Sequence, residues 1–113
     1  MASVFTKIIN GEIPGTILRQ DDEIAVIEDI NPQAPVHLLI IPKREIASIN
    51  DLSAEDSALI GRMVVVAREL ARERQIDESG YRLVFNTGDE GGQSVDHIHL
   101  HLLGGRAMGW PPG

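Results

Sequence analysis

Histidine and aliphatic residues alternate within residues 96–103, near the end of the chain. In a β-strand, side chains two and four positions apart lie on the same face of the sheet. The alternation therefore predicts a strand in which His97, His99 and His101 share one face. The opposite face of this strand carries aliphatic residues, namely Ile98, Leu100 and Leu102. Three of the four histidines of the chain lie here, so we interpret the imidazole face as the centre of a functional site.

Four other segments have the composition of strands, and together with the histidine strand they predict five strands. They are residues 16–19, 23–28, 36–41 and 81–86. Residues 20–22 are predicted to form a hairpin turn between the first two. The segment 36–41 is almost entirely apolar and ends at Pro42, which is typical of a central strand buried on both faces. Residues 29–35 contain two prolines and are predicted to form a fixed, extended loop.

An apolar period of three and four residues predicts one long helix, which begins after Ser53 and runs to about Gln75. Ser53 followed by Asp56 has the pattern of a capping box. We predict that one stripe of this helix faces the core: Leu59, Ile60, Met63, Val64, Ala67, Leu70 and Ala71. Val65 and Val66 widen the apolar surface beyond this stripe. The excess indicates either a helix–helix contact between two subunits or a helix buried on two sides.

Residues 3–10 are predicted to form a short helix, because Ser3 is a suitable N-cap and Asn10 precedes a glycine that ends it. Its apolar face consists of Val4, Phe5, Ile8 and Ile9. This face is expected either to pack on the core or to line a pocket with Phe5 and Ile8.

The composition is that of an ordinary globular protein, with 42% hydrophobic and 24% charged residues among 113. This length predicts one domain, residues 1–113, which would gain stability from oligomerisation. The formal net charge of −7 argues against nucleic acid as a partner, because non-specific binding needs a basic surface. The chain contains no cysteine, no apolar run of membrane-spanning length and no apolar leader, so we expect a cytoplasmic protein with no membrane partner.

The histidine strand permits two kinds of chemistry. Imidazole is a good zinc ligand, but the outer Cα atoms of the three histidines lie about 13 Å apart at roughly 3.3 Å per residue. A pair of these histidines with ligands from elsewhere would still suffice for one ion. The alternative is covalent catalysis on a phosphate, in which one imidazole attacks and its neighbours move protons or stabilise negative oxygens.

Residues 87–95 precede the histidine strand and contain three glycines. Glycine allows backbone N–H groups to turn towards an anion, so this loop is interpreted as a phosphate-binding nest to which Ser94 adds a hydroxyl. A flexible hairpin loop is the alternative. The fourth histidine, His37, is interpreted either as a buried, hydrogen-bonded residue or as a neighbour of the other three across adjacent strands.

The segment 97–103 resembles the motif of the histidine triad family, in which three histidines alternate with hydrophobic residues. Residues 29–37, 41–43, 91–95 and 110–113 resemble the Hint branch of that family, which consists of small homodimeric purine nucleoside phosphoramidases. The resemblance implies an α+β fold with a five-stranded antiparallel sheet, one long helix and a short N-terminal helix. It also implies a homodimer with a continuous ten-stranded sheet.

The resemblance further implies hydrolysis of the P–N bond of purine nucleoside 5′-phosphoramidates, and of the similar aminoacyl-adenylates, without a cofactor. His99 would attack the phosphorus and form a covalent nucleotidyl-histidine intermediate that water hydrolyses. His101 would contact the phosphate oxygens, His97 would orient His99, and His37 would join the hydrogen-bond relay. These four histidines and Ser94 form the expected catalytic set, which needs no metal because histidines near their usual pKa of about 6.5 can divide the proton transfers.

The resemblance also implies where the purine nucleotide binds. Asp29 would bind the ribose, and Asn86 would face the phosphate. The phosphate and the leaving amine would be held by Gly92, Gln93, Ser94 and Val95. The base pocket would consist of Phe5, Ile8, Ile27 and Ile30. Trp110 would reach the active site of the partner subunit.

Three hypotheses follow for the function. The first is the hydrolase, the second is a non-catalytic nucleotide-binding adaptor, and the third is a zinc protein. Ile27 and Glu28 stand where related eukaryotic sequences often have an aromatic residue and a histidine, and Gly109 stands where a larger residue is common. The preference between adenosine and guanosine therefore stays open.

Overall fold

The structure is a computed structural model that describes residues 2–113. One antiparallel sheet contains five strands in the order β1-β2-β3-β5-β4. The strands are β1 (Ile17–Gln20), β2 (Ile24–Glu28), β3 (Val36–Pro42), β4 (Tyr81–Val84) and β5 (Leu100–Gly104). Two α-helices accompany it, α1 (Val4–Ile9) and α2 (Ser57–Glu73), with short 3-10 turns at Ile49–Asp51 and Ala54–Asp56. The predicted α+β class, strand number and two helices are confirmed.

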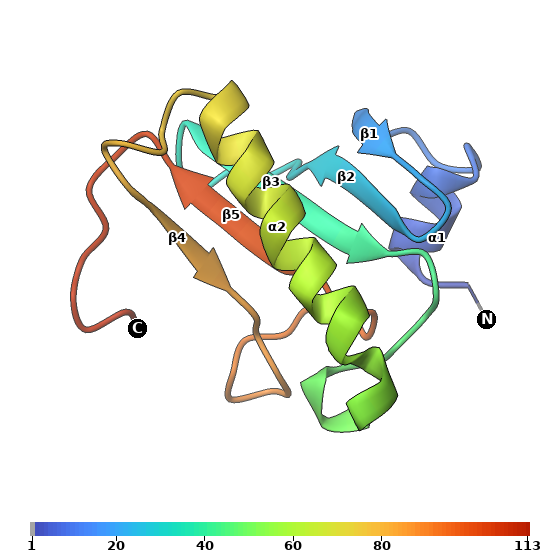
Figure 1. Cartoon of the computed structure of the whole chain (residues 1–113). Helices are drawn as coiled ribbons and strands as arrows, with labels where there is room; N and C mark the ends of the chain where they lie inside the picture. Colours follow the sequence, from blue (N-terminus) through green and yellow to red (C-terminus); the bar gives the residue numbers. More distant parts are fainter. Residues whose placement is uncertain (1) are drawn as a thin grey trace.

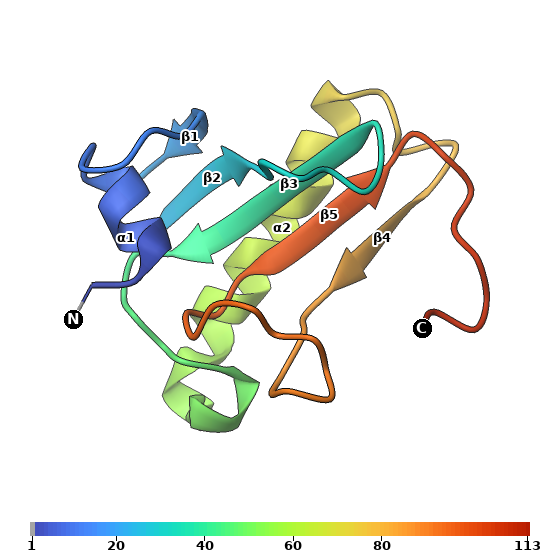
Figure 2. The same cartoon turned by 180° about the vertical axis from the view of Figure 1, so that it is seen from behind.

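The two helices lie on opposite faces of the sheet, as the two views of Figures 1 and 2 show. Each helix packs on its own hydrophobic core, because neighbouring residues of one strand point to opposite faces of the sheet. On the α2 face, Leu38 and Leu100 pack with the buried residues of the helix. On the α1 face, Leu39 and Ile27 pack with Phe5 of the short helix.

The predicted strand at residues 96–103 is shorter than expected, because β5 begins only at Leu100. The N–H of Ile98 donates to the carbonyl of Ile46, 2.7 Å away, instead of joining the ladder. His97 and His99 therefore precede the strand, and only His101 lies within it. In the register of β3 and β5, His101 pairs with Leu39 and His37 pairs with Leu103.

The long helix differs from its prediction at both ends and in one residue of its core stripe. The capping box of Ser53 and Asp56 is present, but it caps a 3-10 turn before α2 begins at Ser57. The helix ends before Gln75, whose φ of 59° reverses the chain. Val64 was predicted in the core but is 41% exposed, whereas Val66 is buried.

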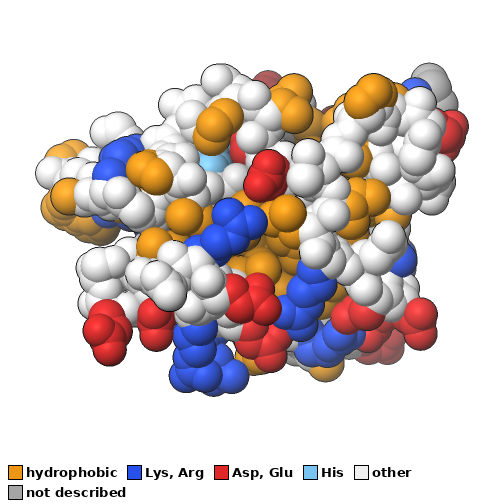
Figure 3. Space-filling model, turned by 90° about the horizontal axis from the view of Figure 1, so that it is seen from above, with side chains coloured by type: hydrophobic (Ala, Val, Ile, Leu, Met, Phe, Trp, Pro, Cys, Tyr) orange, Lys and Arg blue, Asp and Glu red, His pale blue; other side chains and the backbone are white. Residues whose placement is uncertain are grey.

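The remaining elements lie close to their predicted positions. Ser3 is the N-cap of α1, and its hydroxyl accepts from the N–H of Thr6. β1 is displaced by one residue, and β4 ends at Val84 rather than at residue 86. No helix of the described residues is both long and apolar enough to cross a membrane. In Figure 3, most charged side chains lie along the lower edge of the view, below an apolar centre, and a small area of histidine surface is visible.

Candidate active site

A cavity of about 230 Å³ lies on the α1 face of the sheet. The predicted site residues that line it are Phe5, Ile8, Ile27, Asp29, Ile30, Ser94, Val95, His99 and His101. Its apolar wall comes from α1 and the end of β2, and its polar wall comes from the histidines and the loop before them. The cavity thus combines an apolar compartment with two imidazoles and a hydroxyl, which suits a ligand with an aromatic base and a phosphate.

Hydrogen bonding defines the tautomer of His99. Its Nδ1 lies 2.7 Å from the carbonyl oxygen of His97. A carbonyl can only accept, so Nδ1 carries the hydrogen and Nε2 of the neutral ring has a free lone pair. Burial lowers the pKa of the His99 imidazole, which keeps the ring neutral and therefore nucleophilic at neutral pH.

A second chain of hydrogen bonds defines the tautomer of His101. The backbone N–H of Gln33 donates to Nδ1 of His37 at 3.0 Å, so the hydrogen of neutral His37 is on Nε2. That Nε2 lies 2.9 Å from Nδ1 of His101 and donates to it. The hydrogen of neutral His101 is therefore on Nε2, which is buried and has no hydrogen-bond partner among residues 2–113.

The two histidines thus present opposite functions to one cavity. The rings of His99 and His101 lie 4.9 Å apart between centroids, one with a free acceptor and the other with a free donor. Desolvation, with the nearby His99 and His37, lowers the pKa of His101 to about 4. The expectation of histidines near their usual pKa is therefore wrong for His99 and His101, whose rings stay neutral because a buried imidazolium would lose its hydration.

Asp29 lines the cavity and also lies beside the buried His37. Its Oδ1 accepts from the N–H of Asn31 at 2.8 Å, and its Oδ2 lies 3.4 Å from Nε2 of His37. Burial lowers the pKa of His37 while the Asp29 carboxylate opposes that shift. Asp29, His37 and His101 each place one potential metal-ligating atom within 4.8 Å of the others. A zinc ion would accordingly use this group rather than a pair within the triad.

His97 lies apart from the cavity, with a fully buried side chain. Its Nε2 lies 2.7 Å from the carbonyl oxygen of Pro42 and donates to it, and its Nδ1 lies 2.5 Å from Oγ of Ser3. The contact with His99 comes from the backbone carbonyl of His97 and not from its ring. The ring instead connects the start of the histidine segment to the N-terminus of α1.

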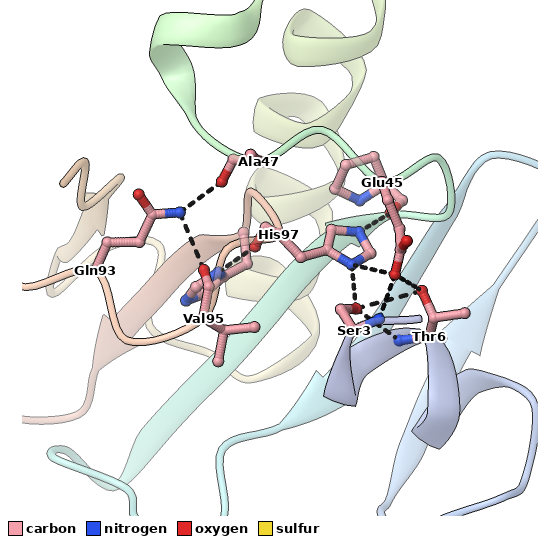
Figure 4. Close-up of polar contacts among 9 residues, drawn as sticks. Ser3, Thr6, Glu45, Ala47, Gln93, Val95 and His97 are labelled. Atoms are coloured by element: carbon pink, nitrogen blue, oxygen red, sulfur yellow. Dashed lines mark hydrogen bonds and ion pairs between the residues drawn. The ribbon is translucent and has the colours of Figure 1, made fainter. Parts of the chain in front are cut away.

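The side chain of Gln93 braces the loop that carries Ser94 and Val95. Its Nε2 donates to the carbonyl oxygens of Ala47 at 2.7 Å and Val95 at 3.0 Å, as Figure 4 shows. Its Oε1 accepts from the N–H of Gly88 at 3.0 Å. All polar groups of this side chain are thus used within the protein, so Gln93 positions the loop.

Three other predicted residues do not line the cavity. Asn86, Gly92 and Trp110 are absent from its lining. The Trp110 side chain is 84% exposed, and the preceding carbonyl of Gly109 accepts from Arg82 at 2.8 Å. Trp110 therefore does not reach the active site of its own chain.

Sequence reasoning missed Val4, Glu28 and Leu39, which also line the cavity. Leu39 shares the face of His37 because it lies two residues further along the same strand, so alternation could have identified it. Sequence reasoning also missed Glu45, which lies beside Ser3. Glu45 belongs to an irregular segment after β3 and has no recognisable sequence pattern.

Comparisons with known proteins extend over almost the whole chain. A family model described as "Scavenger mRNA decapping enzyme C-term binding" matches residues 2–109. The purine nucleoside phosphoramidase of Escherichia coli is 52% identical over 107 residues, which cover 95% of this chain and 90% of that protein.

Solved structures are likewise similar to this chain over almost its whole length. The crystal structure of a HIT family hydrolase from Legionella pneumophila has a TM-score of 0.96 and 54% identity, covering 99% of this chain and 100% of that one. A histidine triad nucleotide-binding protein from Candida albicans has a TM-score of 0.81 and 32% identity, covering 97% and 83%.

Proposed function

Because this chain belongs to the histidine triad family, we propose that it is a hydrolase that cleaves the P–N bond of purine nucleoside 5′-phosphoramidates. The observation that carries the proposal is the pair of complementary tautomers in one cavity. His99 presents a free lone pair on Nε2, and His101 presents a free N–H on Nε2. A phosphoryl group placed between them would meet a nucleophile on one side and a donor to its oxygens on the other.

In the first step, Nε2 of His99 forms a bond to phosphorus, and the P–N bond to the amine breaks. The amine leaves with a proton. The site takes up this proton when the anionic substrate binds, since a nearby negative charge raises the pKa of an imidazole and opposes the effect of burial. The His37–His101 pair beside Asp29 is the part of the site that accepts it.

In the second step, water attacks the phosphorus of the nucleotidyl-histidine and the P–N bond to His99 breaks. The nucleoside monophosphate leaves, and the proton of the water replaces the one that left with the amine. Ser94 and the N–H of Val95 hold the phosphoryl oxygens, Asp29 binds the ribose hydroxyls, and Phe5 with Ile27 contacts the base.

The test is turnover of adenosine 5′-phosphoramidate by wild type and His99→Ala in the presence of EDTA, with AMP binding measured on both. We expect metal-independent turnover by wild type, and loss of at least about 10³-fold in the variant with AMP binding retained. Rapid quenching should reveal a covalent nucleotide on wild type alone. Activity in His99→Ala would refute His99 as the nucleophile.

Other outcomes would support the alternatives. AMP binding without turnover of any phosphoramidate would favour a nucleotide-binding adaptor. Turnover that EDTA abolishes and zinc restores would favour a metal at Asp29, His37 and His101.

We further propose that the single domain works as a homodimer with a ten-stranded sheet. β4 is an edge strand and so offers unpaired backbone groups to a second β4. Val64 and Val65 are 41% and 44% exposed on α2, which suits a helix contact between subunits. The exposed Trp110 would then contribute to the partner's site.

A further inference from the structure

The ring of His97 links the triad to α1, although it does not line the cavity. Ser3 is the N-cap residue of α1, and its hydroxyl lies 2.5 Å from Nδ1 of this buried ring. The other ring nitrogen is held by the carbonyl of Pro42 at 2.7 Å. Because Nε2 donates to that carbonyl, Nδ1 of the neutral ring accepts from the Ser3 hydroxyl.

Glu45 holds the same turn of α1 from the segment that follows β3. Its carboxylate accepts from the backbone N–H of Ser3 and from Oγ1 of Thr6, the latter at 2.8 Å. The N–H of Thr6 in turn donates to Oγ of Ser3 at 3.1 Å. Figure 4 shows these groups converging on Ser3, with Oε1 of Glu45 also 3.9 Å from Nδ1 of His97. We call Ser3, Glu45 and the His97 ring the α1 latch.

The position of α1 determines the shape of the apolar wall. Val4, Phe5 and Ile8 of this helix line the cavity, and the Phe5 ring lies 4.8 Å from the His99 ring between centroids. A helix of six residues is too short to be stable by itself. Its position therefore depends on packing against the sheet and on the polar contacts at its first turn.

We infer that Ser3 and Glu45 are positioning residues, Ser3 fixing α1 through the His97 ring and Glu45 fixing its first turn directly, and that they so control the affinity of the site for the base of the nucleotide. This inference rests on the proposed function for the identity of the ligand. Neither residue lines the cavity, so their effect reaches the ligand only through Phe5 and its neighbours. His97 then has two separate tasks, because its carbonyl orients His99 and its ring orients the wall opposite.

The test compares Ser3→Ala with Ser3→Thr, which keeps the hydroxyl, and with Ser48→Ala as a matched control. Ser48 caps a 3-10 turn with its hydroxyl, at 3.1 Å from the N–H of Asn50, and its side-chain hydrogen bonds stay within that turn. We expect Ser3→Ala to raise KM for adenosine 5′-phosphoramidate and Kd for AMP about tenfold, with kcat changed less than about threefold. Ser3→Thr and Ser48→Ala should resemble wild type.

A second variant and a structural measurement make the outcome specific to the latch. Glu45→Ala should reproduce the change in KM, and the double variant with Ser3→Ala should lose less than the product of the two single effects, since both residues hold one turn. Hydrogen exchange of the α1 amides in the ligand-free protein should be faster in Ser3→Ala and unchanged in Ser48→Ala.

The result that would overturn the latch is a Ser3→Ala protein whose KM, AMP affinity and α1 exchange match those of Ser48→Ala. A loss confined to kcat would do the same, because it would place Ser3 in the chemical step. If wild type turns over no phosphoramidate, the proposed function fails, while AMP binding and hydrogen exchange still test the latch.

Discussion

His99 and His101 are the same residue type two positions apart, yet their rings carry the hydrogen on different nitrogens. The difference comes entirely from their acceptors and donors, namely the His97 carbonyl for one and the His37 ring for the other. Burial then lowers the pKa of both rings, so both imidazoles are neutral at physiological pH.

The activity should consequently persist into mildly acidic solution. The nucleophile must be unprotonated, and the pKa of His99 lies below its ordinary 6.5. We expect the acidic limb of kcat/KM, which reports groups of the free enzyme, to have an apparent pKa below 6.5. A pH profile measured from about pH 4 to 9 checks this, and a limb at or above 6.5 would contradict it.

Stability should decline with acid for the same reason. The pKa of His101 is about 4 in the folded protein against 6.5 ordinarily, so the unfolded state binds the proton first. The contribution of this residue to the free energy of unfolding is largest above pH 6.5 and falls as pH decreases from 6.5 towards 4, by up to about 3 kcal/mol. His99 and His37 act in the same direction.

Urea unfolding of His101→Gln near pH 7 and pH 4.5 isolates this contribution. The variant should lose less stability between the two values than wild type, by roughly 1–3 kcal/mol, whatever its stability at neutral pH. Equal losses in both proteins would exclude His101 as a source of the acid sensitivity.

At the scale of elements, the loop of residues 87–95 holds Ser94 and Val95 against the cavity through close backbone packing. An added Cβ at Gly91 would lie 2.2 Å from the carbonyl oxygen of Thr87 and 2.8 Å from its nitrogen. Neither backbone atom can move without displacing the turn, so the loop requires glycine at this position.

Gly91→Ala should therefore reduce kcat/KM by at least about tenfold and destabilise the protein by roughly 1–3 kcal/mol. Asp89→Ala, an exposed residue of the same loop, should leave both near wild type. Steady-state kinetics and urea unfolding of the two variants provide the measurement. Wild-type activity in Gly91→Ala would mean that the loop does not position the substrate.

Periodicity predicted these elements well where one face is buried, and poorly where the chain bonds to an irregular segment. The alternation correctly separated Leu100 from His101, because the core requires the aliphatic face. It could not show that Ile98 bonds to Ile46, or that the His97 ring turns to Ser3, since both contacts join segments far apart in sequence. Gln93 likewise matched a family motif, but its contacts within the protein emerged only from the structure.

At the scale of the whole molecule, the sheet has two edges at which a second copy of the chain could pair. β4 forms one edge, and β1 forms the other. Both sides of the molecule expose aliphatic residues, with Val65 on α2 at 44% and Leu18 on β1 at 36%. The proposed dimer uses only the side of β4 and α2.

Val65→Asp should shift the protein from dimer to monomer, because a carboxylate buried in an apolar contact loses its hydration. Leu18→Asp introduces the same charge at the opposite edge and should leave the dimer intact. Light scattering after size-exclusion chromatography distinguishes the two. A monomeric wild type, or dissociation caused by Leu18→Asp alone, would refute the proposed arrangement.

The segment from Pro42, the last residue of β3, to Ile46 has a consequence for how this protein tolerates a change in length. Acceptors along it bind the His97 ring at Pro42, the turn of α1 at Glu45, and the N–H of Ile98 at Ile46. Surface connections usually accept an extra residue at little cost. Here one inserted residue would displace successive acceptors from their fixed partners. The length of this segment, although it resembles a linker, is therefore a structural requirement of the active site.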